Sequence, residues 1–165
     1  MIKLLNGNGQ MGTALKHKLS FASALEEVLI YHTWNIEDKS ATIQQQEHSK
    51  FIAFVRKNKN KRIIFISTAS EKENCYVKYK QLSESFLLEN HNNCLVLRIP
   101  TIIGKGVFYG FKESVLVPYG EMNIVTMEQV CDFVSKNLNY KGFLKIKTLN
   151  GHKIDARIVY ELVRL

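Results

Sequence analysis

Short apolar runs alternate along the chain with longer segments in which apolar residues recur at helical spacing. The runs are rich in β-branched residues and have the length of strands, at 2–5, 28–31, 63–66 and 95–99. The helical segments between them cover 11–22, 42–57 and 76–89. This alternation predicts an α/β fold with a mainly parallel sheet covered by helices on both faces. In such a fold, ligands bind at the carboxyl ends of the strands.

The second half of the chain follows the alternation less regularly. After Gly104 the pattern loosens, and it resumes with a predicted helix near 127–138, a strand near 143–148 and a last helix near 154–165. No internal repeat or linker-like change of composition interrupts the chain. Its 165 residues, 45% of them hydrophobic, are enough for one well-formed core. We therefore expect a single domain, residues 1–165.

Composition bears on where the protein works. No apolar run approaches the roughly 20 residues of a membrane span, and the opening MIKLLNGNGQ reaches a glycine loop before a signal-peptide core could develop. We therefore expect a soluble, cytoplasmic protein that does not engage a membrane. Cys75, Cys94 and Cys131 are scattered and form no C-x-x-C pair, so we expect reduced thiols rather than disulfides or a zinc site.

A formal net charge of +8 raises the question of an anionic partner. The densest basic cluster, RKNKNKR at 56–62, lies between a predicted helix and a predicted strand. Cations at that position complement a helix C-terminus and solvate a turn. Aromatic residues are not interleaved with the charges, as they would be on a surface for single-stranded nucleic acid. Nucleic acid is therefore a less favoured partner, and a steep salt dependence of binding would be its signature.

Three glycines, Gly7, Gly9 and Gly12, follow the first predicted strand at G-x-G-x-x-G spacing and open the first predicted helix. A turn of this kind points backbone N–H groups and the helix dipole at a phosphate, and glycine allows the close approach. The other interpretation is a tight turn whose glycines serve packing alone. An acidic residue for the adenosine ribose is usual at the end of the next strand, but VLIYHTW at 28–34 contains none.

Tyr76 and Lys80 are spaced i, i+4 on a predicted helix, which puts both side chains on one helix face. An ammonium nearby can bring the pKa of a phenol toward neutrality and make it a general acid/base. Ser67 and Thr68 end the strand before this helix, where a hydroxyl could hold the substrate oxygen that Tyr76 protonates. Taken alone, a Y-x-x-x-K pair is usually only part of a solvated face.

Six segments in order make the sequence resemble the extended short-chain dehydrogenase/reductase family, the NAD(P)-dependent epimerases, dehydratases and reductases of nucleotide sugars. The glycine loop is particularly similar to that of the dTDP-4-dehydrorhamnose reductase branch. The segments are NGNGQMGTAL, VLIYHTW, IFISTAS, YVKYKQLSE, LVLRIPTIIGKG and NIVTMEQVCDFVSKNL. In the fifth, Arg98, Pro100 and Gly104 match the Arg, Pro and Gly that the family keeps.

The resemblance implies a Rossmann-like, doubly wound fold and a set of site residues. Tyr76 would be the acid/base, Lys80 would lower its pKa and hold the nicotinamide ribose, and Thr68 or Ser67 would orient the reacting oxygen. NAD or NADP would lie against Gly7, Gly9, Gln10, Met11, Gly12 and His32. The substrate would be a nucleoside-diphosphate sugar. The resemblance also implies a homodimer through the Tyr76 helix, where the apolar Leu82, Phe86 and Leu87 permit a helix–helix contact.

Family members are considerably longer than this chain. If 28–31 matches the strand that ends in the cofactor-side His, one strand–helix–strand piece has been lost, and the ribose-binding acid with it. The segment from Thr68 to Tyr76 is also short, so the loop that closes over substrate is trimmed. The fold is therefore expected in a shortened form, with the adenosine half of the cofactor site changed.

Other candidate groups carry weaker signals. The five histidines have no ligand spacing, so we expect no metal site. Arg98 could pair with a phosphate of the nucleotide sugar or form a structural ion pair. Phe108, Tyr109 and Phe111 could line a substrate pocket or plug the core. Two functions stay open: an NAD(P)-dependent oxidoreductase or epimerase of nucleotide sugars, and a non-catalytic Rossmann-like binding or assembly module that has lost its cofactor.

Overall fold

The structure is a computed structural model that describes residues 1–5, 9–104, 110–112 and 114–164. Its main feature is a five-stranded sheet in which every neighbouring pair of strands is parallel. The strands, in their order across the sheet, are β1 (Ile2–Leu4), β2 (Val28–Tyr31), β3 (Arg62–Thr68), β4 (Cys94–Ile99) and β7 (Ile146–Thr148). The predicted α/β fold with a mainly parallel sheet is confirmed.

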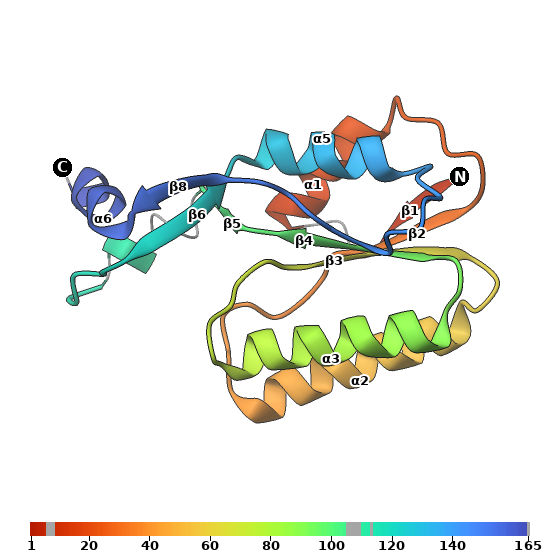
Figure 1. The fold of residues 1–165 in the computed structure, drawn as a ribbon, viewed down its shortest axis with the longest axis horizontal. Coiled ribbons are helices and arrows are strands. Elements are labelled where there is room, and N and C mark those ends of the chain that lie inside the picture. The colour runs from red at the N-terminus through yellow and green to blue at the C-terminus, as the bar shows by residue number, and fades with distance from the viewer. Residues whose placement is uncertain (6–8, 105–109, 113, 165) are drawn as a thin grey trace.

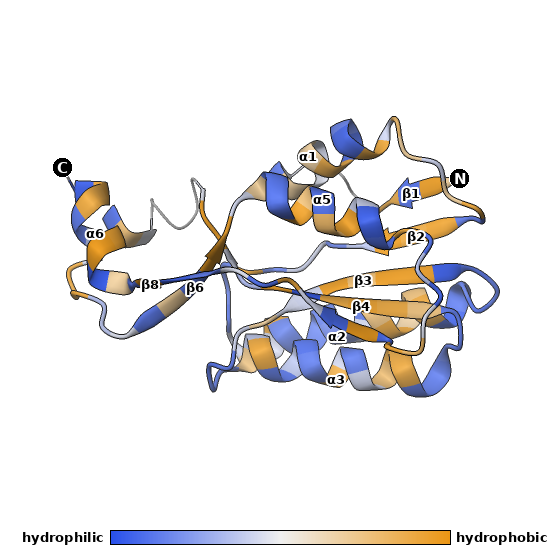
Figure 2. Cartoon of the chain, turned by 45° about the horizontal axis from the view of Figure 1, so that its top comes forward, coloured by the Kyte–Doolittle hydropathy of each residue, from blue (hydrophilic) through white to orange (hydrophobic). Residues whose placement is uncertain are grey.

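Helices cover both faces of this sheet (Figure 1). On one face α1 (Gln10–Leu19) and α5 (Met127–Asn137) bury Leu15 and Val130 against the aliphatic side chains of β2, β3 and β4. On the other face α2 (Ala41–Lys57) and α3 (Cys75–Asn90) enclose a second core cluster, which is rich in aromatic rings. Because both faces are buried, the strands are almost continuously hydrophobic (Figure 2).

The connection through α1 differs in hand from the next two. The chain steps in one direction across the sheet from β1 to β4, yet α1 lies on the opposite face from α2 and α3 (Figure 1). Connections between parallel strands are right-handed in about 98% of cases. The α2 and α3 connections follow this rule, and the α1 connection is left-handed. Removing a strand–helix–strand piece between α1 and β2 would leave this arrangement, which supports the predicted shortening.

A small second sheet lies beyond the carboxyl ends of the main strands (Figure 1). It contains β5 (Thr101–Ile102), β6 (Glu121–Val125) and β8 (His152–Asp155), and α6 (Ala156–Arg164) follows it. Gly120 enters β6 with φ 88°, a conformation that favours glycine. The sequence pattern did not predict these strands, and it placed the start of the last helix at 154, inside β8. Residues 154 and 155 instead pair antiparallel with β6.

Arg62 shows that one member of the basic cluster is not a surface charge. It is buried at the start of β3, where it donates to the carbonyl oxygen of Leu138 at 3.0 Å, to Asn93 Oδ1 at 3.1 Å and to the Tyr140 carbonyl. Arg62 therefore satisfies carbonyls at the end of α5. The rest of the cluster agrees with the prediction, because α2 ends at Lys57 with Arg56 and Lys57 in its last turn.

The expected helix–helix contact of a dimer needs one correction. Leu87 is fully buried within the second core cluster, so it offers no surface to another subunit. Phe86 is partly buried against the same cluster, and Leu82 is 43% exposed. Of the three apolar residues considered, Leu82 is the one on the surface, since the i, i+4, i+5 positions of a helix do not share one narrow face.

All three cysteines are free thiols. Cys94 and Cys131 are buried free thiols and Cys75 is a half-buried one. Within the described ranges, no helix is both long enough and apolar enough to cross a membrane.

We predict that Phe51→Ala lowers the free energy of unfolding by about 3–5 kcal/mol. Phe51 is fully buried, and its ring lies 4.3 Å from that of Phe65 and 4.9 Å from that of Tyr31. Urea unfolding measures the change. Phe21→Ala is the control, because Phe21 is 89% exposed and its removal should change stability by less than about 0.5 kcal/mol. Equal effects of the two substitutions would contradict the core described above.

Candidate active site

The N-terminus of α1 opens at the carboxyl edge of the main sheet. Its N-cap is Gly9, with φ −79° and ψ 174°, and no side chain of the described residues caps the helix. A Cβ at Gly9 would meet no described atom within 4 Å. The first turn, from Gln10 on, contains no acidic residue. Among the described residues, the first N–H groups of α1 thus have no side-chain partner, and together with the helix dipole they have the features of an anion site.

The other predicted cofactor residues near α1 have different surroundings. The Gln10 side chain lies so close to Gly104 that a Cβ there would be 3.2 Å from Gln10 Nε2. Glycine at 104 thus allows the start of α1 to approach the end of β5. Met11 packs against the first core cluster, and Gly12 is buried inside α1. Gly7 lies outside the described residues.

His32 directly follows β2 at the same edge. Its Nε2 is buried and has no hydrogen-bond partner in the described part of the chain. Burial, and next the positive charge of Lys80, lower the pKa of His32 below its usual value. The ring is therefore neutral at pH 7, with a nitrogen available to a ligand.

Ser67 and Thr68 end β3 with hydroxyls in different environments. Ser67 is buried, and among the described groups its Oγ finds no partner. Thr68 Oγ1 accepts the backbone N–H of Ser70 at 3.1 Å and also interacts with the phenol of Tyr76. Buried hydroxyls without partners are uncommon, so the end of β3 has unused hydrogen-bonding capacity.

Tyr76 stands in the first turn of α3, whose start is set by the N-cap Asn74. The Asn74 Oδ1 accepts the Val77 N–H at 2.9 Å. Burial raises the pKa of Tyr76, and the neighbouring Thr68 side chain lowers it by less. The expected lowering of this pKa by Lys80 is therefore not found here. The physical reason is that burial favours the neutral phenol more than the surrounding groups favour the phenolate.

Lys80 points into the protein from the same helix face as Tyr76, as the i, i+4 spacing predicted. Its side chain is only 3% exposed, and Nζ donates to the carbonyl oxygen of Ile66 on β3 at 2.9 Å. Desolvation lowers the pKa of Lys80 to about 7, although the charges of Glu84 and Glu47 work in the opposite direction. Near neutral pH this lysine therefore exchanges between ammonium and amine.

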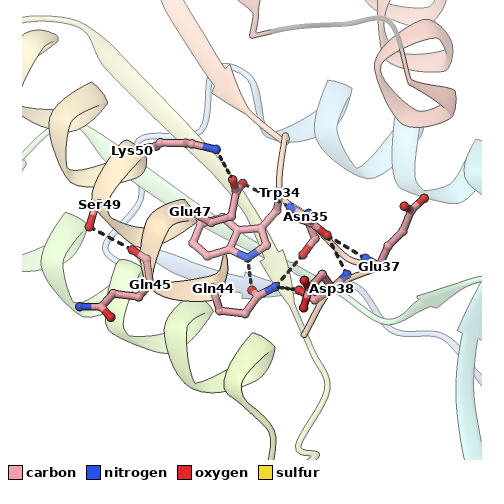
Figure 3. A network of polar contacts seen from close by, with 9 residues as sticks. All are labelled: Trp34, Asn35, Glu37, Asp38, Gln44, Gln45, Glu47, Ser49 and Lys50. Carbon is pink, nitrogen blue, oxygen red and sulfur yellow. Dashed lines mark hydrogen bonds and ion pairs between the residues drawn. The ribbon is translucent and has the colours of Figure 1, made fainter. Parts of the chain in front are cut away.

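A loop after β2 is hydrogen-bonded to α2 (Figure 3), and the ring of its Trp34 lies 4.5 Å from Lys80 Nζ. Trp34 Nε1 donates to Gln44 Oε1 at 2.7 Å, and the Glu47 carboxylate accepts the Asn35 N–H at 3.2 Å and pairs with Lys50. Sequence reasoning missed Trp34 and Gln44 as site residues. Gln44 is a polar residue on the buried face of α2, and a buried amide needs hydrogen-bond partners. A polar residue at an inward-facing helical position was the sequence feature that could have indicated this part of the site.

Arg98 forms a structural ion pair, one of the two possibilities that the sequence left open. Its guanidinium contacts both carboxylate oxygens of the buried Glu84, with Nη2 2.6 Å from Oε2. The Glu84 hydrogen bond raises the pKa of Arg98, so the guanidinium is charged at all ordinary pH values. The pair joins β4 to α3, and the Arg98 side chain remains 37% exposed.

The histidines and acids form no evident metal site. Where residue positions are described, no three His, Cys, Asp or Glu side chains gather closely enough to hold an ion. His48, for example, has its Nδ1 2.8 Å from Ser83 Oγ between α2 and α3. Of the predicted pocket aromatics, Phe108 and Tyr109 lie outside the described residues, and Phe111 packs edge-on to Tyr160 at 6.3 Å.

We predict that Lys80 makes stability depend on pH in a defined window. Its folded-state pKa lies below the unfolded value of 10.5, so the unfolded chain binds more protons between pH 7 and 10.5. Stability contributed by Lys80 must therefore rise with pH through this window, by at most about 1.4 kcal/mol per pH unit. The free energies of unfolding of wild type and Lys80→Met, measured in urea, should therefore differ by an amount that changes with pH at up to this slope. A difference independent of pH would contradict the buried, titrating lysine.

Solved structures share this fold. The enzyme WbmG of Bordetella bronchiseptica, in complex with NAD and UDP, has a TM-score of 0.73 and 13% sequence identity, over 98% of this chain and 76% of that one. The dTDP-4-dehydrorhamnose reductase of Bacillus anthracis, in complex with NADP, has a TM-score of 0.73 and 10% identity, over 99% and 81%. A dTDP-4-dehydrorhamnose reductase of Clostridium acetobutylicum gives 0.70 and 13%, over 99% and 81%.

No protein-family model and no curated protein matches the sequence. At identities this low, the likeness to solved structures is a likeness of fold. It confirms, at the level of the fold, the resemblance that the ordered sequence motifs indicated. The chain has the Rossmann-like α/β fold found in enzymes that bind NAD or NADP.

Proposed function

We propose that this protein is an NAD(P)-dependent oxidoreductase or epimerase that acts on a nucleoside-diphosphate sugar. The observation that carries the proposal is the meeting of Thr68, Tyr76 and Lys80 at the carboxyl end of β3. Three separate groups needed for proton transfer at a hydroxyl or carbonyl thus converge where ligands bind in this fold. The solved structures of similar fold, which include complexes with NADP and with NAD and UDP, support the same substrate and cofactor classes.

The residues at the sheet edge fit part of a dinucleotide. The N-terminus of α1, which no described side chain caps, and the lack of described atoms within 4 Å of a Cβ at Gly9 suit the pyrophosphate. The unpartnered His32 Nε2 and Ser67 Oγ are buried polar atoms that a bound ligand could satisfy. The adenosine side fits less well, because 28–34 contains no carboxylate and β1 is the edge strand of the described sheet.

A nicotinamide held at this edge would supply hydride exchange with a sugar carbon. Tyr76 exchanges the accompanying proton with the sugar oxygen, and the Thr68 hydroxyl orients that oxygen. Because its pKa is raised, Tyr76 is protonated at pH 7 and suited to donate, which is the direction of carbonyl reduction. The Lys80 Nζ is 6.0 Å from the centre of the Tyr76 ring, so its ammonium lies beside the phenol whenever the lysine is charged.

The proposal includes a homodimer formed through the outer surfaces of α2 and α3. These helices pack on each other over the same face of the sheet, and the exposed Leu82 projects from α3. An apolar surface residue on a pair of packed helices suits a second copy of the same pair.

A dinucleotide should stabilise the folded protein. Ligand at a hundredfold excess over Kd contributes about 2.7 kcal/mol, so NADH or NADPH should raise Tm clearly. Gly9→Asp should keep or raise the Tm of the free protein, because its carboxylate caps α1, yet abolish the NADH effect by repelling pyrophosphate. Gly9→Asn, of the same shape and uncharged, is the matched control and should retain more binding than Gly9→Asp.

Absence of any Tm increase with either dinucleotide at millimolar concentration would favour the second candidate, a binding or assembly module without cofactor. Two observations favour this second candidate: segment 28–34 contains no carboxylate, and Arg98 is paired with Glu84.

Tyr76→Phe should lower kcat by about 10²–10⁴-fold while leaving dinucleotide binding intact, because the ring stays and only the transferable proton is lost. Thr68→Ala should lower kcat as well. Turnover of NADH with a panel of nucleoside-diphosphate 4-keto sugars is the measurement. Tyr79→Phe, the same change one turn along α3 at a ring that faces His48, is the control and should be silent. Wild-type rates in Tyr76→Phe would rule out this acid/base.

A further inference from the structure

Aromatic rings from three elements surround the amino group of Lys80. Its Nζ lies 4.5 Å from the centre of the Trp34 ring, 4.7 Å from that of Phe65 and 6.0 Å from that of Tyr76. An ammonium within about 6 Å of an aromatic face is attracted by the quadrupole of the ring, and tryptophan is the strongest partner. The indole of Trp34 is therefore the ring that most favours the ammonium in this place.

Gln44 holds Trp34 in position (Figure 3). Its Oε1 accepts the indole N–H, and its Nε2 donates to the carbonyl oxygens of Asn35 at 2.9 Å and Asp38 at 2.6 Å. Gln44 is fully buried, so its amide has no water to exchange with. Turning the amide over would set its NH₂ against the indole N–H, so one orientation satisfies all partners. The loop and its tryptophan are thus locked onto α2.

We propose that Trp34 is the positioning residue of Lys80: its indole, clamped by Gln44, keeps the ammonium at the carboxyl end of β3 beside Tyr76. The Ile66 carbonyl supplies one hydrogen bond to a group that can donate three. The ring faces take the place of further acceptors in a site that is closed to water. The benefit to catalysis rests on the proposed function, whereas the positioning itself does not.

Charged and titratable groups also face Lys80 from the elements around it. They are Glu47 of α2, Glu84 and Tyr76 of α3, His32 after β2, and Arg98 of β4 through its pair with Glu84. All of them remain when Trp34 is replaced. A change in Lys80 on replacing Trp34, and not on replacing a ring elsewhere in the cluster, is thus an effect of the indole.

The test measures the titration of Lys80 directly, by NMR of the ¹³Cε signals in protein labelled at lysine, with Lys80→Met to assign the signal. In wild type the midpoint should lie near pH 7. Trp34→Leu should lower it by about 0.5–1.5 pH units, and Trp34→Phe, which keeps an aromatic face, should recover part of the shift. Phe54→Leu is the matched control, because that ring belongs to the same cluster but is not one of the three around Lys80.

A second measurement needs no Trp34 variant. Trp34 is the only tryptophan of the chain, so its fluorescence should change with pH near 7 in wild type and lose this change in Lys80→Met. An unchanged Lys80 midpoint in Trp34→Leu, an equal shift in Phe54→Leu, or wild-type fluorescence that does not depend on Lys80 would overturn the proposal.

The outcome separates this proposal from the proposed function. If Trp34 controls the titration midpoint of Lys80 but no dinucleotide raises Tm, the positioning of Lys80 by Trp34 is supported and the proposed NAD(P)-dependent function is rejected. If a dinucleotide raises Tm but replacing Trp34 does not change the titration midpoint of Lys80, the proposed function is supported and the positioning role of Trp34 is rejected.

Discussion

The pairing of β3 with β4 is the interaction on which the fold and the site both depend. Six consecutive residue pairs, from Ile63 with Cys94 to Thr68 with Ile99, run through the buried centre of the sheet. At the amino end of β3, Arg62 binds the end of α5. At the carboxyl end, the strand supplies the Ile66 carbonyl and the Phe65 ring to Lys80, and Thr68 to Tyr76. Slippage by one residue would send these side chains to the opposite faces, so the register of this pair sets the geometry of the site.

Burial shapes the chemistry that this site can perform. Desolvation raises the pKa of Tyr76 and lowers that of Lys80, so each is driven toward its neutral form. The groups that oppose this drive are specific: the aromatic faces and the two glutamates favour the charged lysine, and Thr68 favours the phenolate. A bound ligand that adds hydrogen bonds or charge at this edge would therefore change both protonation states.

Strand β1 forms one edge of the main sheet. The described strands follow one another in one direction from β1 to β4, so their order does not reverse beside β1. The exposed edge is short and carries Lys3, which pairs with Glu27 at 2.8 Å, while Glu27 also binds Lys61 at 3.2 Å. Charges on a short edge strand discourage pairing with other chains. The edge is thereby protected.

The sequence by itself determined what depends on neighbours a few residues apart. The alternation of apolar runs and helical segments gave the α/β class and the main strands and helices, and the i, i+4 spacing brought Tyr76 and Lys80 to one helix face. Only the tertiary structure decided the contacts between distant residues. Examples are Arg62 with Tyr140, 78 positions away, Arg98 with Glu84, and the short strands β5, β6 and β8, which pair across long separations. It also decided that Lys80 lies under Trp34 against the main chain. Periodicity records which face of an element is buried, but the partner that it meets there follows from how several elements pack at once.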